Sequence, residues 1–284
     1  MRAPRPGGGR GWSPAVLLVL AQLVPALLLP AFSVSGAEER YIILASTTST
    51  DNSGFFGHIL PLFQADTGIA VRVVARGTGQ ALRLARSGDA DVVLVHDRES
   101  ELAFVQEGWG VERREVMYND FVLVGPSGDP AQIRGLSDAG QALRRIAEAG
   151  AAFVSRSDDS GTHKAERRLW AAAGLEPTST AGRYLEAGAG MGATLNIASA
   201  MDAYTLADRG TWLAFRNKGR LTILVEGGPA LHNPYSVMLV NPRRHPHVKA
   251  EEGRALIGWM TSPRGRRAIA DFRIGGVQLF HPVE

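Results

Sequence analysis

The chain has 284 residues, with 31 Lys and Arg against 28 Asp and Glu, and its lack of cysteine excludes disulfide bonds and thiolate metal sites. Three of the arginines lie in the first 37 residues, which contain no acidic residue, so the remaining chain has equal numbers of acidic and basic residues. A chain with no net charge and no basic run gives no support for a nucleic-acid partner.

The first 37 residues have the composition of a cleaved secretory signal. A basic start with three arginines precedes an apolar segment at 15–32, and residues 35–37 are small, as a cleavage site requires. An uncleaved membrane anchor is the alternative, but Pro25 and Pro30 weigh against it. We expect cleavage near Ala37 and export of a soluble product, whose roughly 247 residues suffice for one large core or two lobes.

A Ser- and Thr-rich run at 46–54 follows an apolar strand predicted at 41–45. A strand that ends in hydroxyl groups and then opens a helix places O–H groups beside unpaired backbone N–H groups, an arrangement that suits an anion. The helix is expected to begin near Ser53 and to close at Gly68. The alternative is that Asp51, Asn52 and Ser53 serve only as a helix cap.

Two further strands are predicted at 69–75 and 91–96, each followed by an amphipathic helix. This alternation of strands and helices is typical of an α/β fold with parallel strands. Thr78 lies between two glycines at the start of one helix, where the backbone can approach a ligand closely. We expect Asp97 to cap the next helix and His96 to be a packed polar residue.

Two similar segments, 118–126 and 232–242, each have a polar and aromatic beginning, an aliphatic strand and a proline stop. The chain between them has its own α/β pattern. This indicates a second lobe that is entered and left through two neighbouring strands, which would act as a hinge. We therefore predict lobe I at 38–119 and 238–284, and lobe II at 120–237.

The second lobe repeats the arrangement of the first. A strand at 151–154 leads into a hydroxyl-rich turn at 155–162, and a helix follows from Thr162. This turn contains Arg156, which either serves an anion or pairs with a neighbouring Asp at the surface. The second possibility would contribute little to stability.

The glycine-rich segment at 188–192 precedes another helix, but its spacing is not that of a dinucleotide-binding motif. Tyr204 either closes over a ligand or packs in the interior. The C-terminal segment at 248–272 is predicted to form helices that pack on lobe I.

Five collinear segments resemble the tungstate-binding periplasmic proteins of ABC transporters: residues 46–54, 77–82, 91–97, 117–121 and 156–163. The resemblance covers nearly all of the chain after residue 37. It implies the type II periplasmic binding protein fold, with two α/β lobes, a two-strand hinge and a ligand cleft between the lobes. Ser46 stands where that family usually has a threonine, and it keeps the hydroxyl group.

The resemblance also implies a ligand, a site and partners. The ligand would be a tetrahedral oxyanion, tungstate or molybdate, and the protein would be a periplasmic monomer without a cofactor or a bound metal ion. It would deliver the anion to a membrane permease that works with a cytoplasmic ATPase. The implied binding residues are Thr47, Thr48, Ser49 and Thr78 from lobe I and Arg156, Ser160, Gly161 and Thr162 from lobe II.

Two alternatives remain. Residues 156–162 also resemble the matching part of phosphate-binding periplasmic proteins, so a phosphate- or sulfate-binding transport protein is the next hypothesis. A secreted hydrolase is less well supported, because Ser160 and His163 are not framed by a Gly-x-Ser-x-Gly turn and no phosphate-binding loop with a lysine occurs. We therefore do not expect an enzyme.

Overall fold

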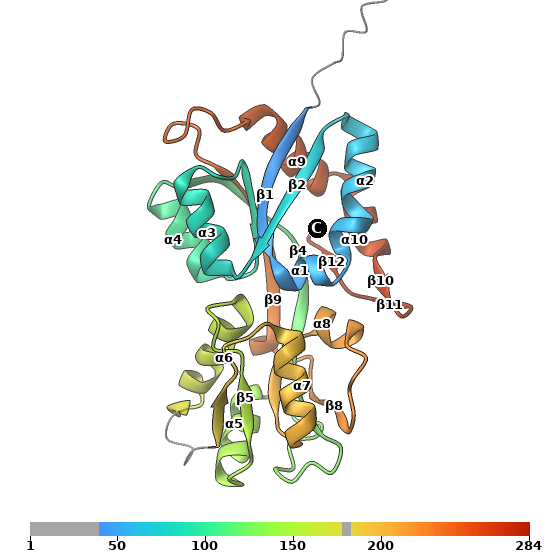
Figure 1. Ribbon diagram of the computed structural model, residues 1–284. Coiled ribbons are helices and arrows are strands. Elements are labelled where there is room, and N and C mark those ends of the chain that lie inside the picture. Colours follow the sequence, from blue (N-terminus) through green and yellow to red (C-terminus); the bar gives the residue numbers. More distant parts are fainter. Residues whose placement is uncertain (1–39, 178–182) are drawn as a thin grey trace, which may run out of the picture. The chain divides into compact units, whose positions relative to one another are not determined.

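The computed structural model describes residues 40–177 and 183–284 (Figure 1). These residues belong to the unit Glu39–Glu284. The signal sequence predicted at 1–37, with its cleavage site, lies outside the described residues. Among the helices in the described ranges, none combines the length and the apolar character needed to cross a membrane.

Three parallel strands form the base of the first part of the fold, which we call lobe I. The central strand β1 (Tyr41–Thr47) pairs with β2 (Ala70–Arg76) on one side and with β3 (Val92–Val95) on the other. β3 is wholly aliphatic and buried and β1 is mostly so, as buried parallel strands usually are, whereas the outer strand β2 carries Arg72 and Arg76 and is only half-buried. Because the three strands are parallel, their carboxyl ends lie at one edge of the sheet. Loops at such an edge commonly bind ligands.

Five longer helices belong to lobe I: α2 (Phe55–Thr67), α3 (Thr78–Ser87), α4 (Arg98–Gln106), α9 (Ala250–Thr261) and α10 (Pro263–Asp271). The core of this lobe joins strand residues such as Leu44 to aromatic residues of α2, including Phe55 and Phe63. As predicted, the C-terminal helices α9 and α10 pack on this core, to which they contribute Leu256 and Ile269.

Two long antiparallel strands, β4 (Gly110–Pro126) and β9 (His232–Val240), connect the two parts of the fold (Figure 1). β9 pairs with β3 in lobe I, while the far end of β4 pairs with two strands of the second part. The prediction that segments 118–126 and 232–242 are neighbouring strands is confirmed, since Asn119 lies opposite Asn233. The lobe boundaries predicted at 119/120 and 237/238 fall inside β4 and β9 and stay a prediction.

The second part, which we call lobe II, contains four more strands: β5 (Phe153–Ser155), β6 (Tyr184–Glu186), β7 (Thr205–Asp208) and β8 (Leu221–Val225). Its helices are α5 (Ala139–Glu148), α6 (Gly161–Ala172), α7 (Met191–Met201) and α8 (Arg209–Ala214), with a 3-10 turn, η2 (Pro229–Leu231), before β9. Neighbouring strand residues point to opposite faces: Phe153 belongs to one hydrophobic cluster and Val154 to another. Lobe II is therefore covered on both faces of its strands.

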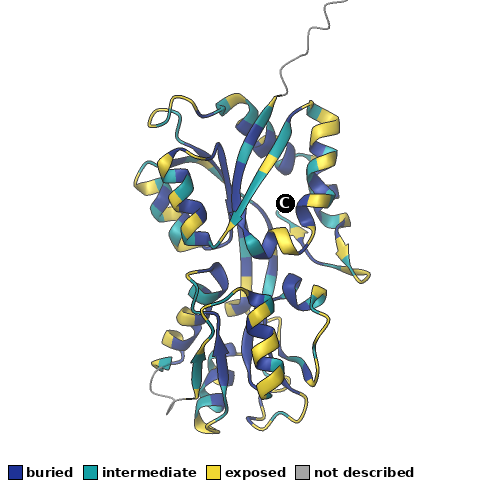
Figure 2. Cartoon of the chain, viewed as in Figure 1, coloured by how far each residue is buried: buried dark blue, intermediate teal, exposed yellow. Residues whose placement is uncertain are grey.

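Figure 2 shows how burial is distributed between the strands and the helices and loops. Most residues of β1, β3, β4, β5, β7 and β9 are buried, whereas β2, β6 and the short strands near the C-terminus are half-buried or exposed, and most exposed residues lie on helices and loops. Near the C-terminus, the hairpin of β10 (Arg273–Ile274) and β11 (Val277–Gln278) leads to β12 (His281–Pro282), which pairs with β4. This last strand lies on β4 beside the hinge, opposite Met117 and Tyr118.

A short helix that the sequence did not predict precedes the first predicted helix. A short helix α1 (Thr48–Asn52) begins inside the Ser- and Thr-rich run, and Thr47 caps it by accepting a hydrogen bond from Thr50 N. Gly54, in the left-handed conformation with φ of 83°, separates α1 from α2. The helix predicted from about Ser53 to Gly68 is α2, which begins at Phe55 and ends at the C-cap Gly68, although Gly54 and not a residue at 51–53 is its N-cap.

Candidate functional site

The first part of the candidate site lies where β1 ends and α1 begins. Thr47, Ser49 and Thr50 are buried, and the Thr47 hydroxyl lies 3.1 Å from Ser49 Oγ and 2.7 Å from Thr50 Oγ1. Thr48 is half-buried. A short helix cannot form without such a cap, so the sequence folds into a cluster of hydroxyl groups directly at the carboxyl end of the central strand.

The second part lies at the carboxyl end of β2. Gly77 is the N-cap of α3 and makes no side-chain cap bond, and Thr78 is the first residue of the helix. Thr78 is fully buried, and its Oγ1 has no hydrogen-bond partner within the described residues. A buried hydroxyl group without a partner costs about 1–3 kcal/mol. It is expected where a ligand or water completes the bond.

The third part is the turn between β5 and α6 in lobe II. Ser160 caps α6, because its Oγ accepts a hydrogen bond from His163 N at 3.2 Å. Ser157 and Asp159 adopt the left-handed conformation, with φ of 46° and 57°, so the turn folds tightly. Thr162 is fully buried in the first turn of the helix. This turn repeats the construction at the end of β1.

Arg156 is the charged group of this turn. Its NH2 donates to Asp158 Oδ2 at 2.6 Å and its NH1 to Thr162 Oγ1 at 3.4 Å, while its buried Nε has no partner within 40–177 and 183–284. The Arg156 side chain is only 3% exposed. The alternative of an Arg–Asp pair at the surface is therefore wrong about the location, because packing in lobe II buries the guanidinium group, although the pairing with Asp158 is present.

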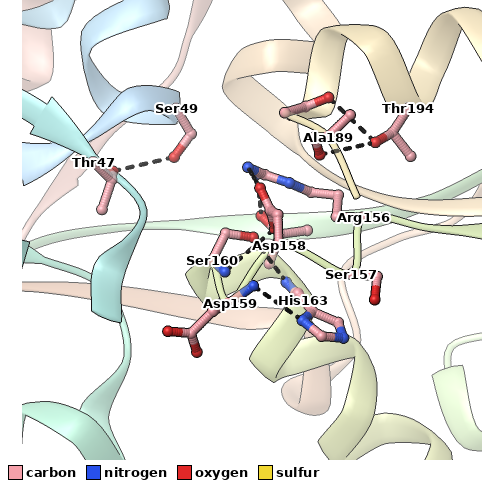
Figure 3. A network of polar contacts seen from close by, with 12 residues as sticks. Thr47, Ser49, Arg156, Ser157, Asp158, Asp159, Ser160, His163, Ala189 and Thr194 are labelled. Carbon is pink, nitrogen blue, oxygen red and sulfur yellow. Dashed lines mark hydrogen bonds and ion pairs between the residues drawn. The ribbon is translucent and has the colours of Figure 1, made fainter. Parts of the chain in front are cut away.

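Figure 3 shows how these groups face one another: Thr47 and Ser49 lie on one side, and Arg156, Asp158 and Ser160 on the other. The two lobes also touch directly here. A Cβ atom placed on Gly77 would be 3.6 Å from the backbone oxygen of Asp158.

Ion pairs between the lobes surround Asp97, which caps α4 as predicted. Arg168 of α6 donates to Asp97 Oδ1 at 2.7 Å, and Lys164 of the same helix donates to Ser100 Oγ at 2.8 Å. Burial acts to raise the pKa of Asp97, but the hydrogen bonds from Ser100 and Arg168 outweigh it, and the pKa lies below its ordinary value. Asp97 is therefore a charged group held by cations of lobe II.

A cavity of about 310 Å³ opens beside the candidate site. It is lined by Thr48, Ser49, Asn52, Arg156, Gly190, Met191, Gly192, Ala193 and Thr211. Three of the eight predicted binding residues, Thr48, Ser49 and Arg156, therefore line one cavity. The other five do not line it: Thr47, Thr78, Ser160, Gly161 and Thr162.

The sequence reasoning missed the start of α7 as part of this cavity. Gly190 is the N-cap of α7 and makes no side-chain cap bond, so the N–H groups of the first turn have no side-chain acceptor at the cap. The glycine-rich segment at 188–192 was the available signal. It follows a strand and precedes a helix, as the three turns described above do, but it contains no hydroxyl group or charge.

Two further residues support the site without lining the cavity. Glu166 of α6 is buried, which raises its pKa to about 7, and it accepts hydrogen bonds from the Tyr184 hydroxyl and from the backbone of Arg156. Tyr204 is fully buried and its hydroxyl donates to Asp129 Oδ1 at 3.0 Å. Of the two roles considered for Tyr204, the structure shows the packing role.

Known proteins resemble this chain over most of its length. Residues 33–264 match the model of the PBP superfamily domain. The tungstate-binding protein TupA of Peptoclostridium acidaminophilum is 45% identical over 245 residues, which make up 85% of this chain and 85% of that protein.

Two solved structures are also similar. The tungstate-binding protein TupA from Desulfovibrio alaskensis G20 is 42% identical with a TM-score of 0.78, and the match covers 86% of this chain and 99% of that one. The structure titled tungstate ABC transporter from Geobacter sulfurreducens is 47% identical with a TM-score of 0.76, and the match covers 82% of this chain and 99% of that one. These similarities confirm the predicted periplasmic binding protein fold.

Proposed function

Since this chain belongs to the PBP superfamily and, within it, to the family of the tungstate-binding proteins, we propose that it binds a tetrahedral oxyanion, tungstate or molybdate, for an ABC transporter. It would act in the periplasm as a monomer, after removal of the signal sequence, and pass the anion to a permease that works with a cytoplasmic ATPase. The relatives named above are described as tungstate-binding or transport proteins, which supports this role and gives no support for catalysis.

One observation carries the proposal: two buried hydrogen-bond donors at the candidate site lack partners within the described residues. They are Thr78 Oγ1 in lobe I and Arg156 Nε in lobe II. Leaving such groups unpaired is costly, and more so when the group is charged. An oxyanion between the lobes would accept both bonds, whereas a neutral apolar ligand would leave both donors unsatisfied.

The residues proposed to bind the anion are Thr47, Thr48, Ser49, Thr78, Arg156, Ser160, Gly161 and Thr162, together with the backbone of residues 190–193. The hydroxyl groups can turn to donate, and the N–H groups at helix starts favour negative charge. Arg156 adds a fixed charge and a planar fork of donors, which Asp158 holds in place.

Binding would favour the closed arrangement of the lobes, because each lobe supplies only part of the donors and the anion therefore has a higher affinity for the closed state. The contacts of α6 with Asp97 and Ser100 already join the lobes on one side of the site. β4 and β9 are the strands about which the lobes would move.

Phosphate fits the site less well, because near neutral pH it keeps a proton that needs an acceptor. Asp97 is held by Arg168, and Asp158 by Arg156. Both carboxylates therefore already have cationic partners, and neither lines the cavity. Tungstate is fully deprotonated and needs only donors, which favours it over phosphate.

Thermal unfolding of the chain without residues 1–37 tests the proposed function. At a thousandfold excess over its dissociation constant, tungstate should stabilise the fold by about 4 kcal/mol and raise the midpoint by about 8–16 °C. Molybdate, sulfate and phosphate are measured in parallel, with sodium chloride at equal ionic strength as the control. If no oxyanion among the four changes the midpoint beyond the chloride control, the proposed function is wrong.

A further inference from the structure

His96 follows β3 and contacts both lobes and the hinge. It is 3% exposed, with Nε2 3.3 Å from Ser49 Oγ and Nδ1 2.9 Å from Oδ1 of Asn233 in β9. The ring of Tyr235 stacks on it, with 4.6 Å between the ring centroids. A Cβ atom placed on Gly161 of α6 would be 2.8 Å from Cε1 of His96. Side chains of lobe I and of the hinge strand β9, together with the backbone of Gly161 in lobe II, therefore surround this imidazole ring.

The hydrogen bonds of Asn233 show which nitrogen of His96 carries the hydrogen. Asn233 Nδ2 donates to Asn119 Oδ1 at 2.6 Å and to the Tyr235 hydroxyl at 3.3 Å, so the amide oxygen of Asn233 faces His96. Nδ1 of His96 must therefore carry a hydrogen, and in the neutral ring Nε2 then has only a lone pair. In the hydrogen bond between Ser49 and His96, Ser49 is therefore the donor, and Thr47, 3.1 Å from Ser49 Oγ, can donate to Ser49 in turn.

A serine hydroxyl has one hydrogen to donate. While that hydrogen is directed at His96, Ser49 cannot donate it to an anion. We propose that His96 is a further positioning residue of the site, which takes up a proton when the oxyanion binds and thereby releases the Ser49 hydroxyl to the anion. This inference rests on the proposed function.

Release of the Ser49 hydroxyl needs one proton from solvent and breaks no covalent bond of Ser49. A proton from solvent binds to Nε2 of His96, and the new N–H group donates to Ser49 Oγ. The hydroxyl hydrogen then turns toward an oxygen of the anion. Ser49, the partner of Nε2, lines the cavity of about 310 Å³ beside the site, and His96 itself lines a second pocket of about 350 Å³.

The charged groups around His96 act in opposite directions on its protonation. Burial lowers the pKa of His96, and Arg156 acts in the same direction, whereas the carboxylates of Asp208 and Asp97 oppose it. Asp208 Oδ1 accepts from Thr211 N, and its buried Oδ2 has no partner in the described part of the chain. The titratable groups that line the second pocket are Arg98, Glu99, Glu115, Arg168 and His232. A bound dianion adds negative charge and favours the protonated ring.

Linkage gives the sign of the pH effect. If the anion raises the pKa of His96, protons are taken up on binding, and the affinity falls as the pH rises between the free and the bound pKa. One proton per anion corresponds to a loss of up to about tenfold in affinity per pH unit.

Calorimetric titration with tungstate in buffers of different ionisation enthalpy tests this inference. The slope of the measured enthalpy against the buffer enthalpy gives the number of protons taken up. Between about pH 6.5 and 8 we expect uptake approaching one proton at the lower end. His96→Gln should abolish it, while His281→Gln, which replaces an exposed imidazole, should leave it unchanged.

Histidine-selective NMR of the parent protein gives a second readout that needs no variant. Free His96 should be neutral with hydrogen on Nδ1, and tungstate should convert it to the doubly protonated form. Tungstate binding without proton uptake, or uptake that persists in His96→Gln, would overturn this inference alone. An absence of tungstate binding would instead contradict the proposed function.

Discussion

The two strand-to-helix turns of the site have the same construction but different chemistry. The turn after β1 supplies hydroxyl groups around Thr47 and Ser49, whereas the turn after β5 contains Arg156, held by Asp158. Each turn is capped by its own Ser or Thr, so local hydrogen bonds shape both of them. On the proposed function, lobe I would recognise the anion through neutral donors, and lobe II would also supply charge.

Replacing Arg156 should have the largest effect on binding. Arg156→Ala removes a charge-assisted donor and should cost about 1.5–3 kcal/mol, a loss of roughly tenfold to a hundredfold in tungstate affinity. Arg156→Lys should restore only part of it, because an ammonium group lacks the planar fork. Arg220→Ala is the matched control, since it removes another Arg–Asp pair of lobe II, at the surface. Unchanged affinity in Arg156→Ala would mean that lobe II contributes no charge.

Glu166→Gln tests how Glu166, which accepts a hydrogen bond from the backbone of Arg156, affects the stability of the fold rather than the affinity for the anion. The pKa of Glu166 is raised to about 7, so its contribution to stability is present at low pH and is lost as the pH rises through about 7. The variant should therefore gain stability relative to the parent between pH 5 and pH 8, by at most about 3 kcal/mol. Chemical unfolding at both pH values measures this, with the exposed Glu148→Gln as the control. An equal difference at both pH values would show that Glu166 is ionised throughout.

Thr78→Val tests a neutral donor of lobe I. The change keeps the shape and removes the unpaired hydroxyl, and it should weaken tungstate binding by about 0.5–1.5 kcal/mol, roughly twofold to tenfold. Thr78→Ser keeps the hydroxyl group and should bind nearly as well as the parent. Calorimetric titration distinguishes the two variants. Equal affinities in Thr78→Val and the parent would remove Thr78 from the site.

Asp97→Asn should have the smallest effect. Asn still caps α4, but the charge that attracts Arg168 and Lys164 is lost, so closure should weaken by up to about 1 kcal/mol. The loss should be equal for tungstate and for phosphate, as measured by competition titration at pH 7, with the exposed Glu99→Gln as control. If phosphate binds the parent as well as tungstate and loses its affinity only in Asp97→Asn, the site is a phosphate site.

The sequence was sufficient to predict the alternating fold and the two hinge strands, because aliphatic runs and proline stops mark these elements directly. It did not predict the short helix α1, which Thr47 caps before the predicted helix begins. The start of α7 was missed because its glycine-rich segment at 188–192 contains none of the hydroxyl or charged side chains that mark the other turns. The burial of Arg156 depends on packing among distant segments of lobe II, which no local pattern contains.

The proposed function requires that donors of both lobes converge on one oxyanion. Anomalous diffraction at a tungsten absorption edge, from crystals grown with tungstate, tests it most directly. We expect one strong peak between the lobes, whose oxygens lie within hydrogen-bond distance of both Thr78 Oγ1 and Arg156 Nε. A tungstate held by one lobe alone, or bound away from these two atoms, would contradict the claim.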